Sequence, residues 1–340
     1  MMTKIALFYG GKITKHLVLV RQAARDMGVD LQLISYNQVC FDTENGEIKI
    51  RTKSLEEGDW VDINGFDVVF FRTTGKHGEE VDLVVEEIRK GGGKAVIVDP
   101  IVKFGKPSYA CKAWQMLKLK EAGIDVPKSV YGSLWYLFDY MKNQENLSSN
   151  NFSSLHDRDV IGLQKNIASK DSDNSQFNFP VIIKGSSGDR GTRVFKADNL
   201  EELEELVRNL RKSETEEGKR YMLQEYIEND GDYRILVLGK KVLGVMKRSS
   251  QSKDEFKNNY SVGGKVEVAD LPEEIKQLAV KAAEVCGLWV AGVDVAFRNF
   301  DKLRPVIWEV NKGPQFKGFM EATGIDVPKE IVKFLVSLKK

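Results

Sequence analysis

Two acidic residues and an asparagine occupy apolar segments near the end of the chain. Carboxylates are uncommon in such segments unless a partner compensates their charge. Asp294 lies in AGVDVAF, and Glu309 and Asn311 lie in VIWEVN. Residues two apart on a strand face the same side of a sheet, so Glu309 and Asn311 project together. If the two segments form a hairpin that turns near Asp301 and Lys302, Asp294 lies directly opposite Glu309.

Carboxylates in direct cross-strand contact destabilise a sheet, and a divalent cation between them removes that penalty. Two carboxylates and an amide carbonyl suit Mg²⁺, which keeps waters and substrate phosphates as its other ligands. The pattern therefore predicts a magnesium site at Asp294, Glu309 and Asn311, with Mn²⁺ as another possible occupant. The alternative is a pair of solvent-facing acids on an edge hairpin, which the apolar flanks disfavour.

A second segment, FPVIIKGSSGDRGTRVF, joins a strand-like apolar run to a lysine and closely spaced small residues. Glycine lets a backbone approach a ligand closely, and successive exposed N–H groups form an anion cradle. The lysine precedes the glycines, so this is not a Walker A loop. The segment predicts another kind of phosphate-binding loop, and an ordinary Gly/Ser turn is the alternative. The residues concerned are Lys184, Gly185, Ser186, Ser187, Gly188 and Gly191.

Further polar residues could contact a nucleotide. Backbone groups from Gln224 to Ile227, between a strand and a loop, could meet an adenine edge, and Asp232 could accept from ribose hydroxyls. Arg234 and Arg248 are expected on neighbouring strands, and arginine forks bind phosphate or carboxylate bidentately. Each residue alone is more simply a solvated side chain or a plain strand end.

The elements that must position these residues follow from hydrophobic periodicity. KIALFYG, LQLISY, FDVVFFRT and KAVIVDP are predicted strands that alternate with helices, which indicates a parallel sheet. The turn YGGKIT lacks the G-x-G-x-x-G dinucleotide fingerprint. YMLQEYI, DYRILVLG, KVLGVMKRS, VAGVDVAFR and PVIWEVN are predicted strands of the second half, with a hairpin turn at Gly239 and Lys240. Residues 143–178 are rich in Asn and Ser and predict a long surface insertion, either a loop without a chemical role or a lid.

Length and composition limit the number of domains and the classes of protein to consider. The chain has 340 residues, which suggests two or three domains. The net charge of +1 gives no indication of nucleic-acid binding, and no apolar run is long enough to span a bilayer. Three scattered cysteines and three scattered histidines predict neither a disulfide framework nor a zinc site. The start of the chain is predicted to be a strand and not a signal peptide, and the expected location is the cytoplasm.

The order of these motifs resembles the ATP-grasp superfamily, and most closely its RimK-like carboxylate–amine ligases. The resemblance covers about residues 109–335, carried by the lysine–glycine loop, QEYI, DYRILVLGKKVLGVMKR, FKNNYSVGG, AGVDV and WEVNKGPQFKGFMEATGID. It implies a mixed α/β (α+β) fold in which a Rossmann-like domain, 1–108, precedes a two-subdomain ATP-grasp fold. The expected subdomains are 109–222, which holds the glycine loop, and 223–340, which holds the metal site.

The resemblance also implies roles for residues. Lys112 and Lys184 match the two ATP-binding lysines, and Glu225 and Tyr226 match the hinge pair whose backbone meets adenine. Asp232 matches the ribose contact. The family's remaining site positions correspond to three sets: Lys257, Asn258 and Asn259 near the phosphates; Arg234 and Arg248 near the acyl phosphate and acceptor; and Asp294, Glu309 and Asn311 on Mg²⁺.

Three departures from the family pattern bear on these roles. Cys111 replaces an acid before the first lysine, Lys257 replaces an arginine, and 312–315 replaces a Ser/Ala-Ser-Pro-Gly segment. The last change affects the expected acceptor pocket more than the ATP site. Arg72, at a strand end, is a candidate substrate contact, although the alternative, an ordinary surface arginine, is the simpler interpretation.

The activity that the resemblance implies is an ADP-forming, ATP- and Mg²⁺-dependent ligase that makes an amide bond through an acyl phosphate. It would join an amino acid such as glutamate to a peptide, a protein tail or a small molecule. The alternatives are an ATP-grasp kinase and a module that binds ATP without turnover. A homodimer or homotetramer is expected, and neither nucleic acid nor membrane is an expected partner.

Overall fold

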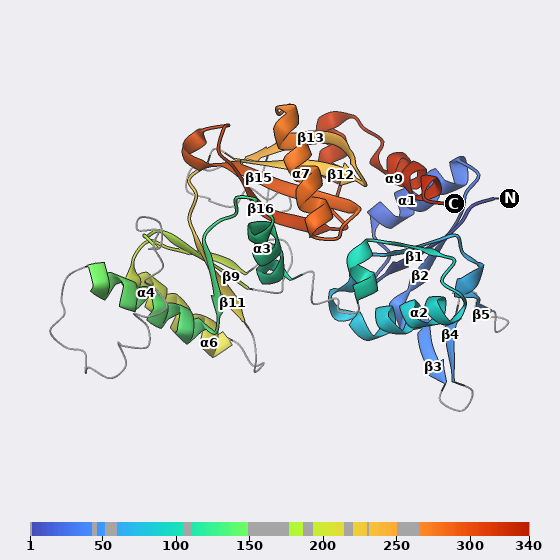
Figure 1. Ribbon diagram of the computed structural model, residues 1–340, viewed down its shortest axis with the longest axis horizontal. Coiled ribbons are helices and arrows are strands. Elements are labelled where there is room, and N and C mark those ends of the chain that lie inside the picture. The colour runs from blue at the N-terminus through green and yellow to red at the C-terminus, as the bar shows by residue number, and fades with distance from the viewer. Residues whose placement is uncertain are drawn as a thin grey trace. The chain divides into compact units, whose positions relative to one another are not determined.

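The structure is a computed structural model of the 340-residue chain, and Figure 1 shows its helices and strands. The chain divides into two compact units. The first combines Met1–Val126 with Glu228–Lys340, and the second is Pro127–Ile227. The three-part division expected from the sequence stays a prediction. The residues that the structure describes are 2–42, 46–51, 60–104, 111–148, 177–185, 193–213, 220–229, 231–249 and 265–339.

A parallel sheet opens the first unit, which confirms the predicted alternation of strands and helices. The strands lie in the order β2-β1-β6-β7, and every neighbouring pair is parallel. All four residues of β6, VVFF, are buried, as expected for a parallel strand whose side chains are covered on both faces. The elements are β1 (Lys4–Tyr9), α1 (Lys15–Asp26), β2 (Asp30–Ser35), β6 (Val68–Phe71), α2 (Gly78–Lys90) and β7 (Val96–Val98).

A small antiparallel sheet lies between β2 and β6 along the chain and was not predicted. Its order is β3-β4-β5, formed by Val39–Asp42, Glu47–Arg51 and Trp60–Val61. These strands are only two to five residues long, and β4, EIKIR, alternates charged residues with apolar ones. Such short segments give little periodic signal, so the sequence did not distinguish them from a loop.

The first unit also contains a five-stranded antiparallel sheet in the order β14-β13-β12-β15-β16. The predicted hairpin turn at Gly239 and Lys240 joins β12 to β13. Helix α7 contacts β12, β13, β15 and β16, and helix α8 contacts β13 and β14. The elements are α3 (Lys112–Glu121), β12 (Asp232–Leu238), β13 (Lys241–Ser249), β14 (Lys265–Ala269), α7 (Glu273–Val285), β15 (Val290–Phe297), β16 (Pro305–Lys312), α8 (Lys317–Thr323) and α9 (Val327–Ser337).

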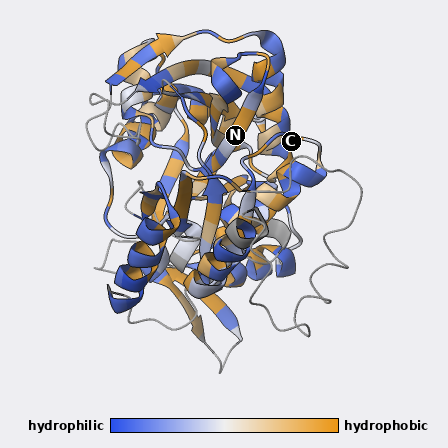
Figure 2. Ribbon diagram, turned by 90° about the vertical axis from the view of Figure 1, so that its left-hand side faces the viewer, coloured by the Kyte–Doolittle hydropathy of each residue, from blue (hydrophilic) through white to orange (hydrophobic). Residues whose placement is uncertain are grey.

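One hydrophobic core joins the two larger sheets of the first unit. Leu7 and Phe70 of the parallel sheet belong to the same buried cluster as Leu236 and Val290 of the antiparallel sheet, and Ile331 of α9 joins them. Helix α9 packs against α1. The chain therefore returns at its end to cover the sheet with which it began. In Figure 2, orange segments are concentrated on strands, and the helices carry blue turns.

The second unit is a four-stranded sheet in the order β10-β9-β11-β8, with helices α4 and α6 packed against each other. Helix α4 corrects the predicted insertion, because residues 143–148 continue the helix and only 149–176 lie outside the described residues. The aromatic run LWYLFDYM supplies the buried face of α4, which outweighs the polar composition that follows. The elements are β8 (Ser129–Gly132), α4 (Leu134–Ser148), β9 (Val181–Gly185), β10 (Val194–Ala197), α6 (Leu200–Ser213) and β11 (Tyr221–Glu225).

In the described part of the chain, no helix is long and apolar enough to cross a bilayer.

Candidate active site

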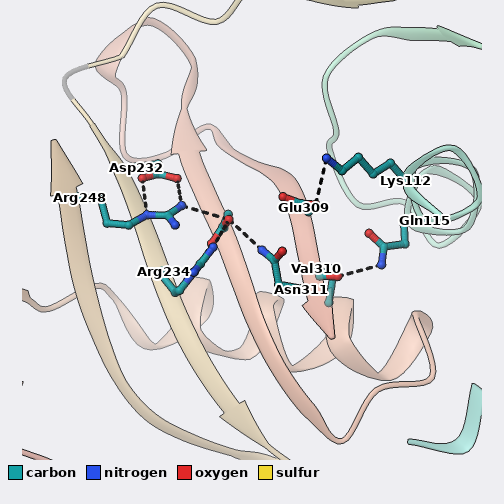
Figure 3. A network of polar contacts seen from close by, with 9 residues as sticks. Lys112, Gln115, Asp232, Arg234, Arg248, Glu309, Val310 and Asn311 are labelled. Carbon is teal, nitrogen blue, oxygen red and sulfur yellow. Dashed lines mark hydrogen bonds and ion pairs between the residues drawn. The ribbon is translucent and has the colours of Figure 1, made fainter. Parts of the chain in front are cut away.

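The two acids of the predicted metal site are cross-strand partners. Strands β15 and β16 pair antiparallel with Asp294 opposite Glu309, and the connecting turn is closed by hydrogen bonds among residues 298–304. The register shifts after Asp294, which leaves Trp308 as an extra residue in β16. Asn311 Nδ2 donates to Asp294 Oδ2 at 3.0 Å (Figure 3). The hairpin that the sequence predicted is therefore formed.

Two arginines hold the Asp294 carboxylate. Arg234 donates to it through Nε and Nη2, both at 2.7 Å, and Arg248 Nη2 lies 3.0 Å from Oδ2. Arg234 is adjacent on β12, in direct register with Asp294. Burial alone would raise the pKa of Asp294, but the two guanidinium groups outweigh it and the pKa is lowered. Asp294 is therefore a buried carboxylate that stays ionised.

A second carboxylate completes this network. Asp232 accepts from Arg248 Nε at 2.9 Å and also from its Nη2, and both residues are only 3% exposed. Burial raises the pKa of Asp232, and the neighbouring charge of Asp294 adds to that effect. Both Asp232 oxygens are engaged by Arg248, so the predicted ribose contact has no free carboxylate oxygen in this arrangement. That role stays a prediction.

Helix α3 brings a lysine to the other acid. Lys112 is the first residue of α3, and its Nζ lies 3.5 Å from Glu309 Oε1. One turn later, Gln115 Nε2 donates to the Val310 carbonyl at 2.8 Å (Figure 3). Gln115 was not predicted, although its i+3 spacing from Lys112 places both on one face of a helix. The two contacts fix the start of α3 against β16.

The donor set suits a hard cation by its chemistry. Asp294, Glu309 and Asn311 carry carboxylate and amide oxygens on one strand pair, the ligand types that Mg²⁺ prefers. In this arrangement both Asp294 oxygens are engaged, by Arg234, Arg248 and Asn311, so a metal ion would have to replace some of these contacts. Among the described residues, no group of three or more His, Cys, Asp or Glu could hold a metal ion. An asparagine-containing set of two acids is therefore the candidate that the described chain offers.

The remaining predicted nucleotide residues belong to the second unit or fall outside the described residues. Lys184 and Gly185 end β9, where Lys184 pairs with Val194 and Met222. Glu225 Oε1 accepts from the Lys128 backbone N–H at 2.8 Å. Lys196 Nζ lies 5.0 Å from the ring centroid of Tyr226. Outside the described residues lie Ser186, Ser187, Gly188, Lys257, Asn258 and Asn259.

Arg72 is not a surface arginine, so that alternative is wrong. Its side chain is buried, and Nη2 donates to the carbonyls of Gly313 at 2.9 Å and Pro314 at 3.3 Å. Burial lowers the pKa of Arg72 to about 10, and the charge of Asp99 opposes that shift. The sequence could not reveal this burial, because the partners are more than two hundred residues away along the chain.

Comparison with known proteins identifies the family to which this architecture belongs. The model of the RimK-like ATP-grasp domain matches residues 155–335. The chain belongs to the RimK-like ATP-grasp family. The matched range includes the β12–β13 arginines and the β15–β16 hairpin, so the family match and the polar network coincide.

The curated relatives of this RimK-like protein are similar over part of their length. A probable alpha-L-glutamate ligase of Syntrophotalea carbinolica is 35% identical over 168 residues, 49% of this chain and 53% of its own. Another, of Halorhodospira halophila, is 36% identical over 163 residues, 47% and 51% of the two chains. The chain thus spans about half the length of the curated relatives it matches.

Solved structures show the fold across the whole chain. The ATP-grasp ligase PsnB, complexed with a minimal precursor, gives a TM-score of 0.64 at 16% identity, covering 99% of both chains. A RimK domain protein of Sphaerobacter thermophilus gives 0.63 at 15% identity, covering 98% of this chain and all of the other. The predicted ATP-grasp fold with a preceding α/β region is confirmed.

Proposed function

We propose that this chain is an ATP-dependent, ADP-forming ligase that joins a carboxylate to an amine. In the first step a substrate carboxylate oxygen attacks the γ-phosphorus of ATP, and the bond to ADP breaks. In the second step an amine nitrogen attacks the acyl carbon of the resulting acyl phosphate, and phosphate leaves. The observation that carries the proposal is the pairing of Asp294 with Glu309 and Asn311 in a RimK-like ATP-grasp chain.

Asp294, Glu309 and Asn311 would hold Mg²⁺ in this proposal. A bound Mg²⁺ screens the phosphate charges and stabilises the charge that develops during phosphoryl transfer. The structure of PsnB with a precursor variant, Mg and ADP supports the use of magnesium within this fold. Lys112, 3.5 Å from Glu309, supplies a further cation at the same strand.

The two arginines have different exposure, which separates their proposed roles. The Arg234 side chain is 14% exposed and that of Arg248 is 4% exposed. Arg248 is therefore a positioning residue that orients Asp294 from within the sheet. Arg234, the more exposed of the two, is the better candidate to contact the transferred phosphoryl group, through the N–H groups that do not hold Asp294.

On the family pattern we assign Lys184, Glu225 and Tyr226 to ATP, together with Gly185, Ser186, Ser187 and Gly188. Phosphoryl transfer asks a protein mainly for positioning and charge neutralisation. The described residues of the candidate site supply lysine, arginine, carboxylate and amide groups, in keeping with that requirement.

The proposed substrates are an amino acid, with glutamate as the first candidate, and an amine on a peptide or protein. Two observations support this choice. The curated relatives are named probable alpha-L-glutamate ligases, and PsnB and the macrocyclase MdnC were solved with precursor peptides. A small-molecule acceptor remains part of the screen described next.

An ADP-release assay tests the proposal. The full chain is incubated with ATP, Mg²⁺, single amino acids and a panel of peptides and small-molecule amines, and products are identified by mass spectrometry. We expect ADP formation that depends on both substrates and an amide product. Glu309→Gln should lower turnover at least a hundredfold. Glu267→Gln, which changes an exposed acid on β14 of the same sheet, is the matched control and should leave it unchanged.

Two outcomes contradict the ligase proposal. A stable phosphorylated product without an amide would indicate a kinase. Binding of ATP without ADP under any substrate pair would indicate a module that does not turn over. Full activity of Glu309→Gln would contradict the assigned metal site alone.

A further inference from the structure

The carboxyl edge of the parallel sheet holds a second group of polar residues that the proposed reaction does not use. In the order β2-β1-β6-β7, the chain adds β2 on one side of β1 and then β6 and β7 on the other side, so a switch point lies between β1 and β6. In open α/β sheets, ligands bind beyond the carboxyl ends of the strands at such a switch point. Gly10 follows β1 there, Arg72 follows β6, and Asp99 follows β7.

Hydrogen bonds and unusual backbone angles hold this edge in one shape. Thr73 Oγ1 accepts from the Gly10 N–H at 2.8 Å, which ties the ends of β1 and β6 together. Tyr36 donates its hydroxyl to the Arg72 carbonyl at 2.8 Å. Thr73 and Asp99 have φ of 52° and 64°, in the left-handed region that non-glycine residues rarely occupy. Strained residues of this kind cluster at functional sites.

The segment after β16 forms the other side of this group. Lys312 Nζ lies 3.2 Å from Thr74 Oγ1, and Arg72 Nη2 donates to the carbonyls of Gly313 and Pro314. Lys312 directly follows Asn311, a proposed metal ligand. The edge cluster, defined as Arg72, Thr74 and Lys312, is thus continuous in sequence with the proposed reaction centre.

Positive charge exceeds negative charge in the edge cluster. The charge of Asp99 acts on both Arg72 and Lys312. Asp99 is fully buried, and its Oδ1 accepts from the N–H groups of Trp289 and Val290. Two cations therefore share one buried carboxylate, of which Oδ1 is held by backbone donors and Oδ2 has no hydrogen-bond partner among the described residues.

The hydrogen-bonding capacity of Arg72 is only partly used. Both hydrogen bonds that Arg72 donates to described residues come from Nη2, and neither Nε nor Nη1 hydrogen-bonds to a described residue. A buried cation without enough partners is unfavourable unless an anion joins it. Consistent with this imbalance, burial lowers the pKa of Arg72 to about 10.

We propose that the edge cluster binds a carboxylate of the acidic substrate, through the arginine fork and the lysine. The net excess of one positive charge matches a monoanion, and a planar guanidinium matches a carboxylate. This inference rests on the proposed function for the identity of the substrate, but the binding site itself does not require turnover.

Direct binding is the first test. The full chain without nucleotide is titrated in a calorimeter with L-glutamate, glutarate, uncharged glutaramide or inorganic phosphate. We expect L-glutamate or glutarate to bind and glutaramide not to bind. Lys312→Met, which keeps the length of the side chain, should weaken that binding at least tenfold. Lys317→Met removes an exposed lysine five residues further on and should change it less than twofold.

Three results of the titration overturn the proposal: no binding of either dicarboxylate, equal binding by Lys312→Met, or binding of inorganic phosphate alone. The melting temperature of each variant is measured alongside, so that loss of folding is not counted as loss of binding. Arg72→Lys keeps the charge and removes the fork, and it provides a second variant should Lys312→Met unfold.

Steady-state kinetics separate a binding role from a structural one. If Arg72 binds the acid, Arg72→Lys raises the KM for that acid at least tenfold and leaves the KM for ATP unchanged. If it only holds the turn at Gly313 and Pro314, kcat falls while the KM for the acid stays constant, which overturns the inference. Wild-type ADP release is the reference: turnover with an unchanged KM in Arg72→Lys refutes the edge cluster and leaves the ligase proposal standing.

Discussion

Removal of Arg248 should destabilise the first unit strongly, because Arg248 is the shared partner of two buried carboxylates. It makes two hydrogen bonds to Asp232 and one contact of 3.0 Å to Asp294, and all three residues are at most 4% exposed. Arg248→Met keeps most of the side-chain volume. It leaves Asp232 without its hydrogen-bonded cation, while Asp294 keeps Arg234.

The expected loss is about 3–5 kcal/mol of unfolding free energy, the cost of breaking a buried ion pair from one side. Exposure decides this magnitude more than distance does. The Arg89–Glu86 pair also has a separation of 2.7 Å, as Arg234 and Asp294 have, but the Arg89 side chain is 76% exposed. Arg89→Met is therefore the matched control, and we expect no measurable change in stability from it.

Urea unfolding followed by tryptophan fluorescence is a suitable assay. Four of the five tryptophans, all but Trp135, belong to the first unit, so the signal follows the unit that contains Arg248. In the double variant Arg248→Met with Asp232→Leu, stability should recover in part, because no unpaired carboxylate remains at that position. A loss below about 1 kcal/mol in Arg248→Met would refute the reasoning that burial makes this network costly to break.

Three further predictions concern groups away from the candidate site. Asp67 accepts from Lys339, which with the Lys4 N–H holds the pKa of Asp67 below its usual value of 3.8 despite burial. Its stabilising contribution is present above that value and declines as the pH falls through the lowered pKa; Asp67→Asn should abolish this part of the acid dependence, and an unchanged stability–pH curve would contradict it. Burial raises the pKa of Cys286 to about 12, so a thiol reagent at pH 8 should modify the exposed Cys40 and leave Cys286 intact until the protein unfolds, and equal modification rates would contradict the burial. Gly123 has φ of +73° with open space around its Cβ position, so Gly123→Ala should cost about 1–2 kcal/mol in the same urea assay, through backbone strain alone, and no loss would argue against that conformation.

The periodicity of the sequence predicted the hairpin of the candidate site, because the residues that define this hairpin lie close together along the chain. Asp294, Glu309 and Asn311 sit in strongly apolar strands, and a two-residue period determines which of them share a face. The turn near residues 298–304 is short enough that only one register places an acid opposite an acid. The parallel sheet followed equally directly from four apolar runs separated by helical segments.

Contacts between distant parts of the chain could not be obtained in this way. The burial of Arg72 depends on the carbonyls of Gly313 and Pro314, and nothing near position 72 indicates them. The paired state of Asp294 was also missed, because β12 must lie beside β15 for Arg234 to reach it. Polar composition misled the prediction at 143–148, where helix α4 continues because its aromatic face is buried earlier in the helix.

The transfer of oxygen from substrate to phosphate tests the central claim most directly. The acidic substrate is prepared with a heavy oxygen isotope in its carboxylate, turnover is started with ATP and Mg²⁺, and the released phosphate is analysed by mass spectrometry. An acyl phosphate formed by attack of that carboxylate predicts one heavy oxygen in each phosphate released. Phosphate that carries none, while the amide product accumulates, would contradict the proposed ligase mechanism.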